Sequence, residues 1–163
     1  EIKDGSYLMK HNNEEGSYAS YREFNFVQTK AIRLETKIQT IQTSIEGEYG
    51  IIWGLSIDSL NNWKFSIFTI KGNEFYIGTM EAEFKAICPW SFSPIIKTGV
   101  NSENTLELVK FDNEIDKQVY FLINNKMVFQ TDFFPVFGNL HGLILYHKVA
   151  VAIDYFKARF YCA

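Results

Sequence analysis

The sequence has few of the residues that crosslink a chain or interrupt its regular structure. Its 163 residues include two cysteines, three prolines and ten glycines. So little proline and glycine excludes a collagen-like or linker-rich protein. The two cysteines, Cys88 and Cys162, allow either one disulfide in an oxidising compartment or two free thiols. We expect no essential disulfide, because a domain of this length buries enough apolar surface to fold without one.

Positive charge is also sparse. The chain has 16 Lys and Arg against 19 Asp and Glu, which gives a formal net charge of -3 at pH 7. The basic residues occur singly, so the cationic patch that displaces counterions from nucleic acid is missing, and we expect no nucleic-acid partner. No apolar run approaches the ~20 residues that cross a bilayer, so we also expect no membrane insertion.

The start of the chain bears on where the protein works. It begins at Glu1, without a methionine and without a charged and apolar leader. We interpret it as a mature protein whose signal has been removed, or as a domain whose partner is the remainder of a larger protein. The expected location is secreted, periplasmic or associated with the cell envelope, with the cytoplasm as the alternative.

Paired catalytic acids are missing from the expected strands. A glycosidase needs two carboxylates about 5–9 Å apart, and alternate residues of one strand supply them readily. The nearest pattern is Asp112, Glu114 and Asp116, but these acids lie between two expected strands, where they are ordinary turn residues. Glu46 and Glu48 are expected to face solvent. We therefore predict no catalytic residue, and no activity on polysaccharides.

Metal and cofactor signatures are equally scarce. The spacing of the three histidines matches no zinc motif, and no glycine-rich phosphate loop is present. We expect no cofactor and no metal site. A structural calcium ion held by Asp58, Asn61 and Asn62 remains open, although a single acid supplies little charge for it.

Aromatic residues are what the sequence has in excess. Fifteen Phe, nine Tyr and three Trp make up 17% of the chain, and 47% of it is hydrophobic. Aromatic and β-branched residues favour strands. Alternating segments recur between clusters of Asn, Gly, Asp and Ser, which is typical of a sandwich or barrel. The strands are expected at 6–10, 18–26, 31–43, 49–57, 63–70, 74–79, 82–87, 105–111, 118–123, 126–131, 142–147 and 149–160.

These segments predict a single all-β domain over residues 1–163, a two-sheet antiparallel sandwich with less than about a tenth of the chain in helices. Asn124 and Asn125 separate two alternating segments, where a two-residue type I′ turn needs positive φ angles that Asn tolerates. Within 31–43 the apolar positions change phase between Ile38 and Ile41, which predicts a bulge or a bend there.

Four stretches resemble a known group of domains. They are YGIIWG at 49–54, NWKFSI at 62–67, WSFSPII at 90–96, and the ending formed by 119–128 with 138–156. Together they resemble bacterial jelly-roll domains related to laminin-G-like modules and to the concanavalin A-like lectin/glucanase superfamily. Asn125 stands where the group has a turn glycine, and both residues accept that conformation. The resemblance implies a jelly roll, and its members include sugar-binding modules, glycosidases and interaction modules.

The aromatic surplus suggests a function. Sugar rings stack on aromatic faces, so we predict a lectin-like, non-catalytic recognition module that binds a glycan or other polar ligand on a concave sheet face and its rim. The candidate ligand-binding residues are Arg22, Trp53, Trp63, Tyr76, Trp90 and Tyr146. Core packing competes for each aromatic, most strongly for Trp53, whereas Trp90 is expected in a loop. The alternatives are a jelly-roll glycoside hydrolase with acids from separate strands, and a protein–protein interaction module.

Overall fold

The computed structural model describes residues 2–3, 5–24, 31–111 and 118–161 of the chain. These residues form thirteen strands and no helix, which confirms the all-β prediction. The strands are β1 (Ile2–Lys3), β2 (Ser6–His11), β3 (Ser17–Glu23), β4 (Ala31–Thr43), β5 (Glu48–Ile57), β6 (Trp63–Lys71), β7 (Glu74–Met80), β8 (Phe84–Phe92), β9 (Glu103–Lys110), β10 (Val119–Ile123), β11 (Lys126–Thr131), β12 (Leu140–Tyr146) and β13 (Val149–Tyr161).

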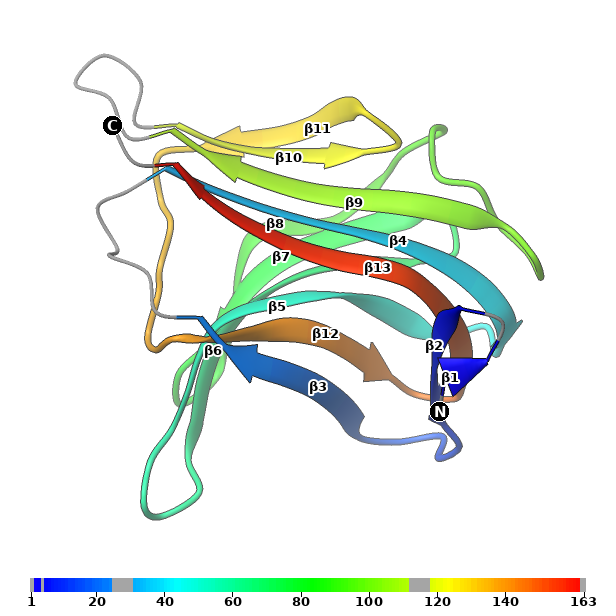
Figure 1. The fold of residues 1–163 in the computed structure, drawn as a ribbon, viewed down its shortest axis with the longest axis horizontal. Helices are drawn as coiled ribbons and strands as arrows, with labels where there is room; N and C mark the ends of the chain where they lie inside the picture. The colour runs from blue at the N-terminus through cyan, green and yellow to red at the C-terminus, as the bar shows by residue number, and fades with distance from the viewer. Residues whose placement is uncertain (1, 4, 25–30, 112–117, 162–163) are drawn as a thin grey trace.

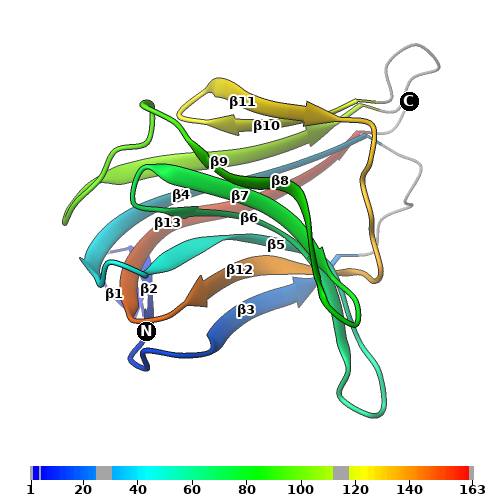
Figure 2. The ribbon, with the colours of Figure 1, turned by 180° about the vertical axis from the view of Figure 1, so that it is seen from behind.

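The strands form two antiparallel sheets packed face to face (Figure 1). One sheet has the order β1-β2-β13-β4-β9-β10-β11 and the other the order β3-β12-β5-β6-β7-β8. The chain crosses between the sheets after β2, β3, β4, β8, β11 and β12, and Figure 2 shows the two layers from behind. This crossing pattern is a jelly-roll sandwich, as the sequence predicted.

The core lies between the sheets and follows the alternation of the sequence. In β4 every second side chain points inward, among them the fully buried Ile32, Leu34 and Ile38. The expected change of phase is wrong, because Thr40 takes the next inward position and Ile41 is exposed. The Thr40 hydroxyl donates to the Tyr49 hydroxyl at 3.2 Å, so a threonine is satisfied in the core. The expected bulge is nevertheless supported, because the register of the pairing between β4 and β13 shifts at Ile41, between Thr40 and Gln42.

Two local features test the turn and strand predictions. Asn124 and Asn125 have φ angles of 51° and 64°, as the expected type I′ turn requires. Strand β8 extends through Pro89 and Trp90 to Phe92, so the expected loop at Trp90 is wrong. Proline is tolerated there because β8 is an edge strand, and the register shifts between β7 and β8 across this segment.

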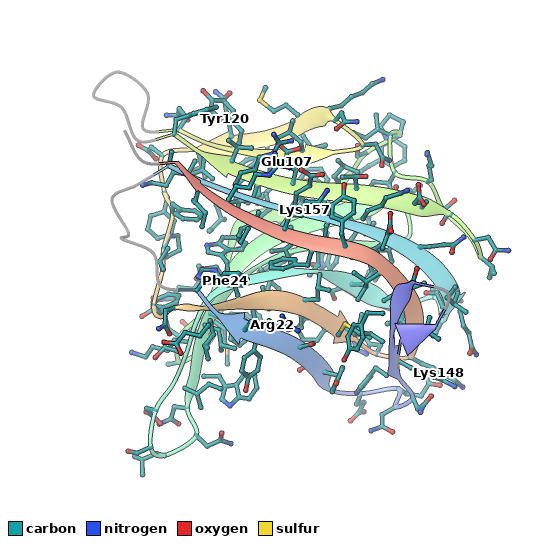
Figure 3. All side chains as sticks on the ribbon, viewed as in Figure 1. Arg22, Phe24, Glu107, Tyr120, Lys148 and Lys157 are labelled. Atoms are coloured by element: carbon teal, nitrogen blue, oxygen red, sulfur yellow. The ribbon has the colours of Figure 1, made fainter. Side chains whose placement is uncertain are left out.

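The outer face of the seven-stranded sheet is polar. Arg33 contacts Glu107 at 3.0 Å and Glu35 at 3.3 Å, and Lys37 contacts Glu103 at 3.1 Å. Figure 3 shows Glu107 and Lys157 over this sheet, on β9 and β13. Charged side chains in cross-strand pairs are typical of a face that water covers.

The outer face of the six-stranded sheet is apolar. A second hydrophobic cluster lies on it, in which Ile52, Leu55 and Ile144 are at most 2% exposed. The Phe84 and Tyr146 rings are 6.5 Å apart although β8 and β12 are separated by four strand spacings, roughly 19 Å in a flat sheet. These rings meet because their side chains extend toward each other across the outer face and the sheet curves toward that face. The sheet therefore shelters a second apolar surface in addition to the core.

Candidate functional site

The candidate site is a hollow in the outer face of the six-stranded sheet, which we call the aromatic hollow. Its volume is about 290 Å³, and it is lined by Glu48, Ile67, Tyr76, Phe84, Trp90 and Tyr146. The residues come from five adjacent strands, β12, β5, β6, β7 and β8. Neighbouring strands place side chains of the same face next to one another, which is how residues far apart in sequence meet here.

Tyr76 and Trp90 form one wall of the aromatic hollow. Their ring centroids are 5.4 Å apart with the planes tilted by 34°. The Tyr76 ring lies over Gly78, since a β-carbon added at Gly78 would be 2.5 Å from its Cε1 and hydroxyl oxygen. The missing side chain at Gly78 therefore lets Tyr76 lie along the sheet surface.

Phe84 and Tyr146 also line the aromatic hollow. The Phe84 ring packs edge-on against Phe65, with centroids 5.9 Å apart, and also contacts Tyr146. Phe84 is nevertheless 49% exposed, so part of its ring is open to a ligand. The Tyr146 hydroxyl is buried without a hydrogen-bond partner among the described residues. Burial raises the pKa of Tyr146, with the Glu48 carboxylate adding to the shift, so this hydroxyl keeps its proton and can donate it to a ligand.

Glu48 is the acid of the aromatic hollow. Its side chain is buried, and its Oε1 accepts a hydrogen bond of 2.6 Å from the hydroxyl of the fully buried Thr69. Burial raises the pKa of Glu48 above its usual value, and this outweighs the lowering by Thr69 and by the Lys71 charge. Within the part of the chain that the structure describes, the second carboxylate oxygen has no donor and Glu48 has no ion pair. Glu48 therefore has one acceptor oxygen to spare.

Lys71 closes the rim of the aromatic hollow beside Trp90. Its Nζ lies 4.7 Å from the centroid of the Trp90 ring and 3.0 Å from Oε2 of Glu46. The ammonium group thus makes a cation–π contact and a salt bridge at the same time. Because Lys71 forms this salt bridge with Glu46, its positive charge is shared between Glu46 and Glu48.

Three of the six predicted ligand-binding residues, Tyr76, Trp90 and Tyr146, come together in the aromatic hollow. Trp53 does not, because it is fully buried in the core, where its ring stacks on Phe134 at 5.6 Å. Its place among the ligand-binding candidates is a misassignment, and the competing expectation of a core role fits its position. Trp63 belongs to the outer apolar cluster but is not part of the hollow; its indole nitrogen donates to Oδ1 of Asn61 at 3.0 Å.

Arg22 lies on the other face of the six-stranded sheet, at a cleft of about 580 Å³ between the two sheets. Figure 3 shows Arg22 on β3 and Phe24 just beyond it, and both line this cleft together with the buried His141. Burial lowers the pKa of His141 to about 4, so its imidazole is neutral at physiological pH. The structure thus separates Arg22 from the aromatic residues that sequence reasoning grouped with it.

The remaining candidates from the sequence concern acids, cysteines and a metal ion. Asp112, Glu114 and Asp116 lie outside the described residues, and so does Cys162, while Cys88 is a buried free thiol. Among the residues that the structure describes, no three His, Cys, Asp or Glu side chains gather in a way that could hold a metal ion. The Asp58 carboxylate accepts bonds from the backbone and side-chain amides of Asn62 and from the Leu60 amide, which lower its pKa and close the turn.

Sequence reasoning missed three residues of the hollow, Glu48, Ile67 and Phe84. Glu48 was expected to face solvent, which is wrong: its exposed fraction is 8%. The alternation does place Glu48 on the outer face, but it does not tell that this face is covered by aromatic rings from β7, β8 and β12. An acid in line with Gly50 and Ile52 on an otherwise apolar face was the available signal.

Known proteins share this fold at very low sequence identity. No family model and no curated protein sequence matches the chain. The carbohydrate-binding module CBM66 of Bacillus subtilis is similar in structure with a TM-score of 0.62, at 9% identity over 95% of each chain. The carbohydrate recognition domain of Emp46p, in a metal-free form, has a TM-score of 0.63 at 12% identity, covering 97% of this chain and 83% of that one.

A third similar structure matches this chain over only part of its own length. A GH43 protein of Bacillus licheniformis has a TM-score of 0.64 at 12% identity, and the match covers 98% of this chain but only 34% of that protein. At such identities the similarity establishes the fold alone, a jelly-roll sandwich. In the described ranges, no helix is long and apolar enough to span a membrane.

Proposed function

We propose that this chain is a non-catalytic glycan-recognition module whose ligand binds in the aromatic hollow. The observation that carries the proposal is the contrast between the two outer faces. One face is an array of paired charges, whereas the other holds Tyr76, Phe84, Trp90 and Tyr146 around a sheltered carboxylate. Aromatic faces for C–H groups and a few fixed polar atoms for hydroxyls are what a sugar ring needs. The similar structures named for carbohydrate binding support the same reading.

The acid content of the hollow favours recognition over hydrolysis. Glu48 is the one carboxylate among the described residues that line it, while Glu46 at the rim is paired with Lys71. A glycosidase of either stereochemistry needs two carboxylates facing the scissile bond. The hydrolase alternative would therefore need a second acid from outside the hollow. We keep the interaction module as the other candidate, because an apolar outer face could also meet a protein.

The experiment is a glycan-array screen followed by calorimetric titration of the selected glycans. We expect affinities no tighter than about micromolar, roughly -8 kcal/mol, because the hollow is open to solvent. A stacking ring contributes about 1–2 kcal/mol, so Phe84→Ala should weaken binding about tenfold. Phe92→Ala is the matched control, since Phe92 lies on the same strand, is 65% exposed and does not line the hollow. No bound glycan, or equal loss in both variants, would reject the proposal.

A further inference from the structure

If the aromatic hollow binds a glycan, as proposed above, the charge in the hollow limits the chemical class of glycan that it selects. We propose that the hollow selects glycans with a free amino group, an ammonium-bearing hexosamine, over the same glycans with a hydroxyl or acetamide in that place. The ammonium would lie between the aromatic walls and donate to the spare oxygen of Glu48. This inference rests on the proposed function and adds to it the chemical class of the sugar.

The first argument is the unbalanced charge. Lys71 forms its ion pair with Glu46, at 3.0 Å, and acts on Glu48 only from a distance, so Glu48 is a sheltered carboxylate without an ion pair in the described part of the chain. A buried charge without a partner is costly, and a cation that arrives with hydrogen-bond donors removes much of that cost. An anionic sugar would add a like charge instead. The electrostatics therefore disfavour uronic and sialic acids and favour an ammonium.

The second argument is the aromatic lining. Four rings, those of Tyr76, Phe84, Trp90 and Tyr146, line the same hollow as Glu48. Aromatic faces attract cations, a Lys ammonium among them, and cages of several rings hold methylated ammonium groups in other proteins. The molecule already shows this preference at the rim, where the Lys71 ammonium lies 4.7 Å from the centre of the Trp90 ring. The remaining aromatic faces and Glu48 offer the same environment to a ligand.

The third argument concerns the hydrogen bonds. Thr69 uses one oxygen of Glu48 and leaves the other as an acceptor, while the buried Tyr146 hydroxyl has no partner among the described residues. An ammonium supplies three donors, so one can reach Glu48 while a neighbouring sugar hydroxyl pairs with Tyr146. A hydroxyl at the same carbon could satisfy one acceptor but would leave the charge of Glu48 uncompensated.

Three tetrasaccharides with one β-1,4-linked backbone test the inference, since they differ only at carbon 2. They are the tetramer of glucosamine, the tetramer of N-acetylglucosamine and cellotetraose, titrated calorimetrically at pH 6 and physiological salt. We expect the glucosamine tetramer to bind at least tenfold more tightly than the other two. Glu48→Gln should abolish this preference, because the amide keeps the Thr69 bond but not the charge. Glu83→Gln, which removes an exposed acid next to Phe84, should leave it intact.

The outcomes separate this inference from the proposed function. Three results would overturn the inference and leave the module a glycan binder. They are equal binding of the three tetramers, a preference that survives Glu48→Gln, and binding of other glycans on the array without binding of the glucosamine tetramer. If no glycan binds on the array and none of the three tetramers binds in the titrations, the proposed function is overturned, and the inference with it.

Discussion

Replacing Trp53 by alanine tests the division of the aromatic residues between core and surface. Trp53 is fully buried, stacks on Phe134 with an interplanar angle of 8°, and contacts Phe121 at 5.9 Å. Removing a buried Trp side chain costs about 3–5 kcal/mol, the sum of lost burial and the cavity left behind. The indole nitrogen has no hydrogen-bond partner in the described residues, which makes its loss less costly and points to the lower half of that range.

The assay is thermal and urea unfolding of the wild type, Trp53→Ala and Trp63→Ala. In a chain of this size each kcal/mol shifts the melting temperature by about 2–4 °C, so we expect a loss of about 10 °C for Trp53→Ala. Trp63 is half-buried and makes an edge contact with Tyr21, so its removal should cost about 1–2 kcal/mol. A loss below about 1 kcal/mol for Trp53→Ala, or equal losses for the two variants, would refute the assignment of Trp53 to the core.

Three further predictions follow from buried groups. Burial lowers the pKa of His141 from 6.5 to about 4, so the contribution of its neutral form to the free energy of unfolding is complete above pH 6.5. As the pH drops to 4, the free energy of unfolding should fall by about 3 kcal/mol, and pH-dependent unfolding of His141→Asn should not show this loss. Burial raises the pKa of Glu48, so its contribution to stability is present below pH 4.5 and is lost as the pH rises through the folded-state pKa. Because Gln carries no charge at either pH, Glu48→Gln should melt at a higher temperature than wild type at pH 7 but not at pH 4. Gly78→Ala should displace the Tyr76 ring and weaken glycan binding about tenfold in the same titrations, with a melting temperature within a few degrees of wild type; unchanged affinity would contradict the role given to that ring.

The fold could be predicted from the sequence because its signals are local. Alternation in β4 and paired asparagines at 124 and 125 specify a strand and a turn without reference to the rest of the chain. The wrong predictions concern features that depend on contacts with residues far away in the sequence. The phase of β4 depends on Thr40 finding a hydroxyl partner in Tyr49. Pro89 is tolerated in β8 because no strand of the described residues pairs with the outer edge of β8.

The site could be predicted only in part, for the same reason. The sequence indicates which residues are aromatic, but the face on which each one lies depends on the register and on the curvature of the sheet. Tyr76, Trp90 and Tyr146 share the hollow because β7, β8 and β12 curve toward each other, and Arg22 lies on the other face of the sheet. The local pattern of β5 shows the face on which Glu48 lies, but Glu48 is buried by rings from three other strands, which that pattern does not show.

The most direct test of the central claim, that a glycan binds in the aromatic hollow, is amide chemical-shift mapping. A ¹⁵N-labelled sample would be titrated with the glycan that binds most tightly on the array. We predict that the largest shift changes cluster at residues 48, 76, 84, 90 and 146, with little change near Arg22 and His141. Changes centred on the cleft between the sheets, or spread over the charged face that carries Arg33 and Glu107, would contradict the account.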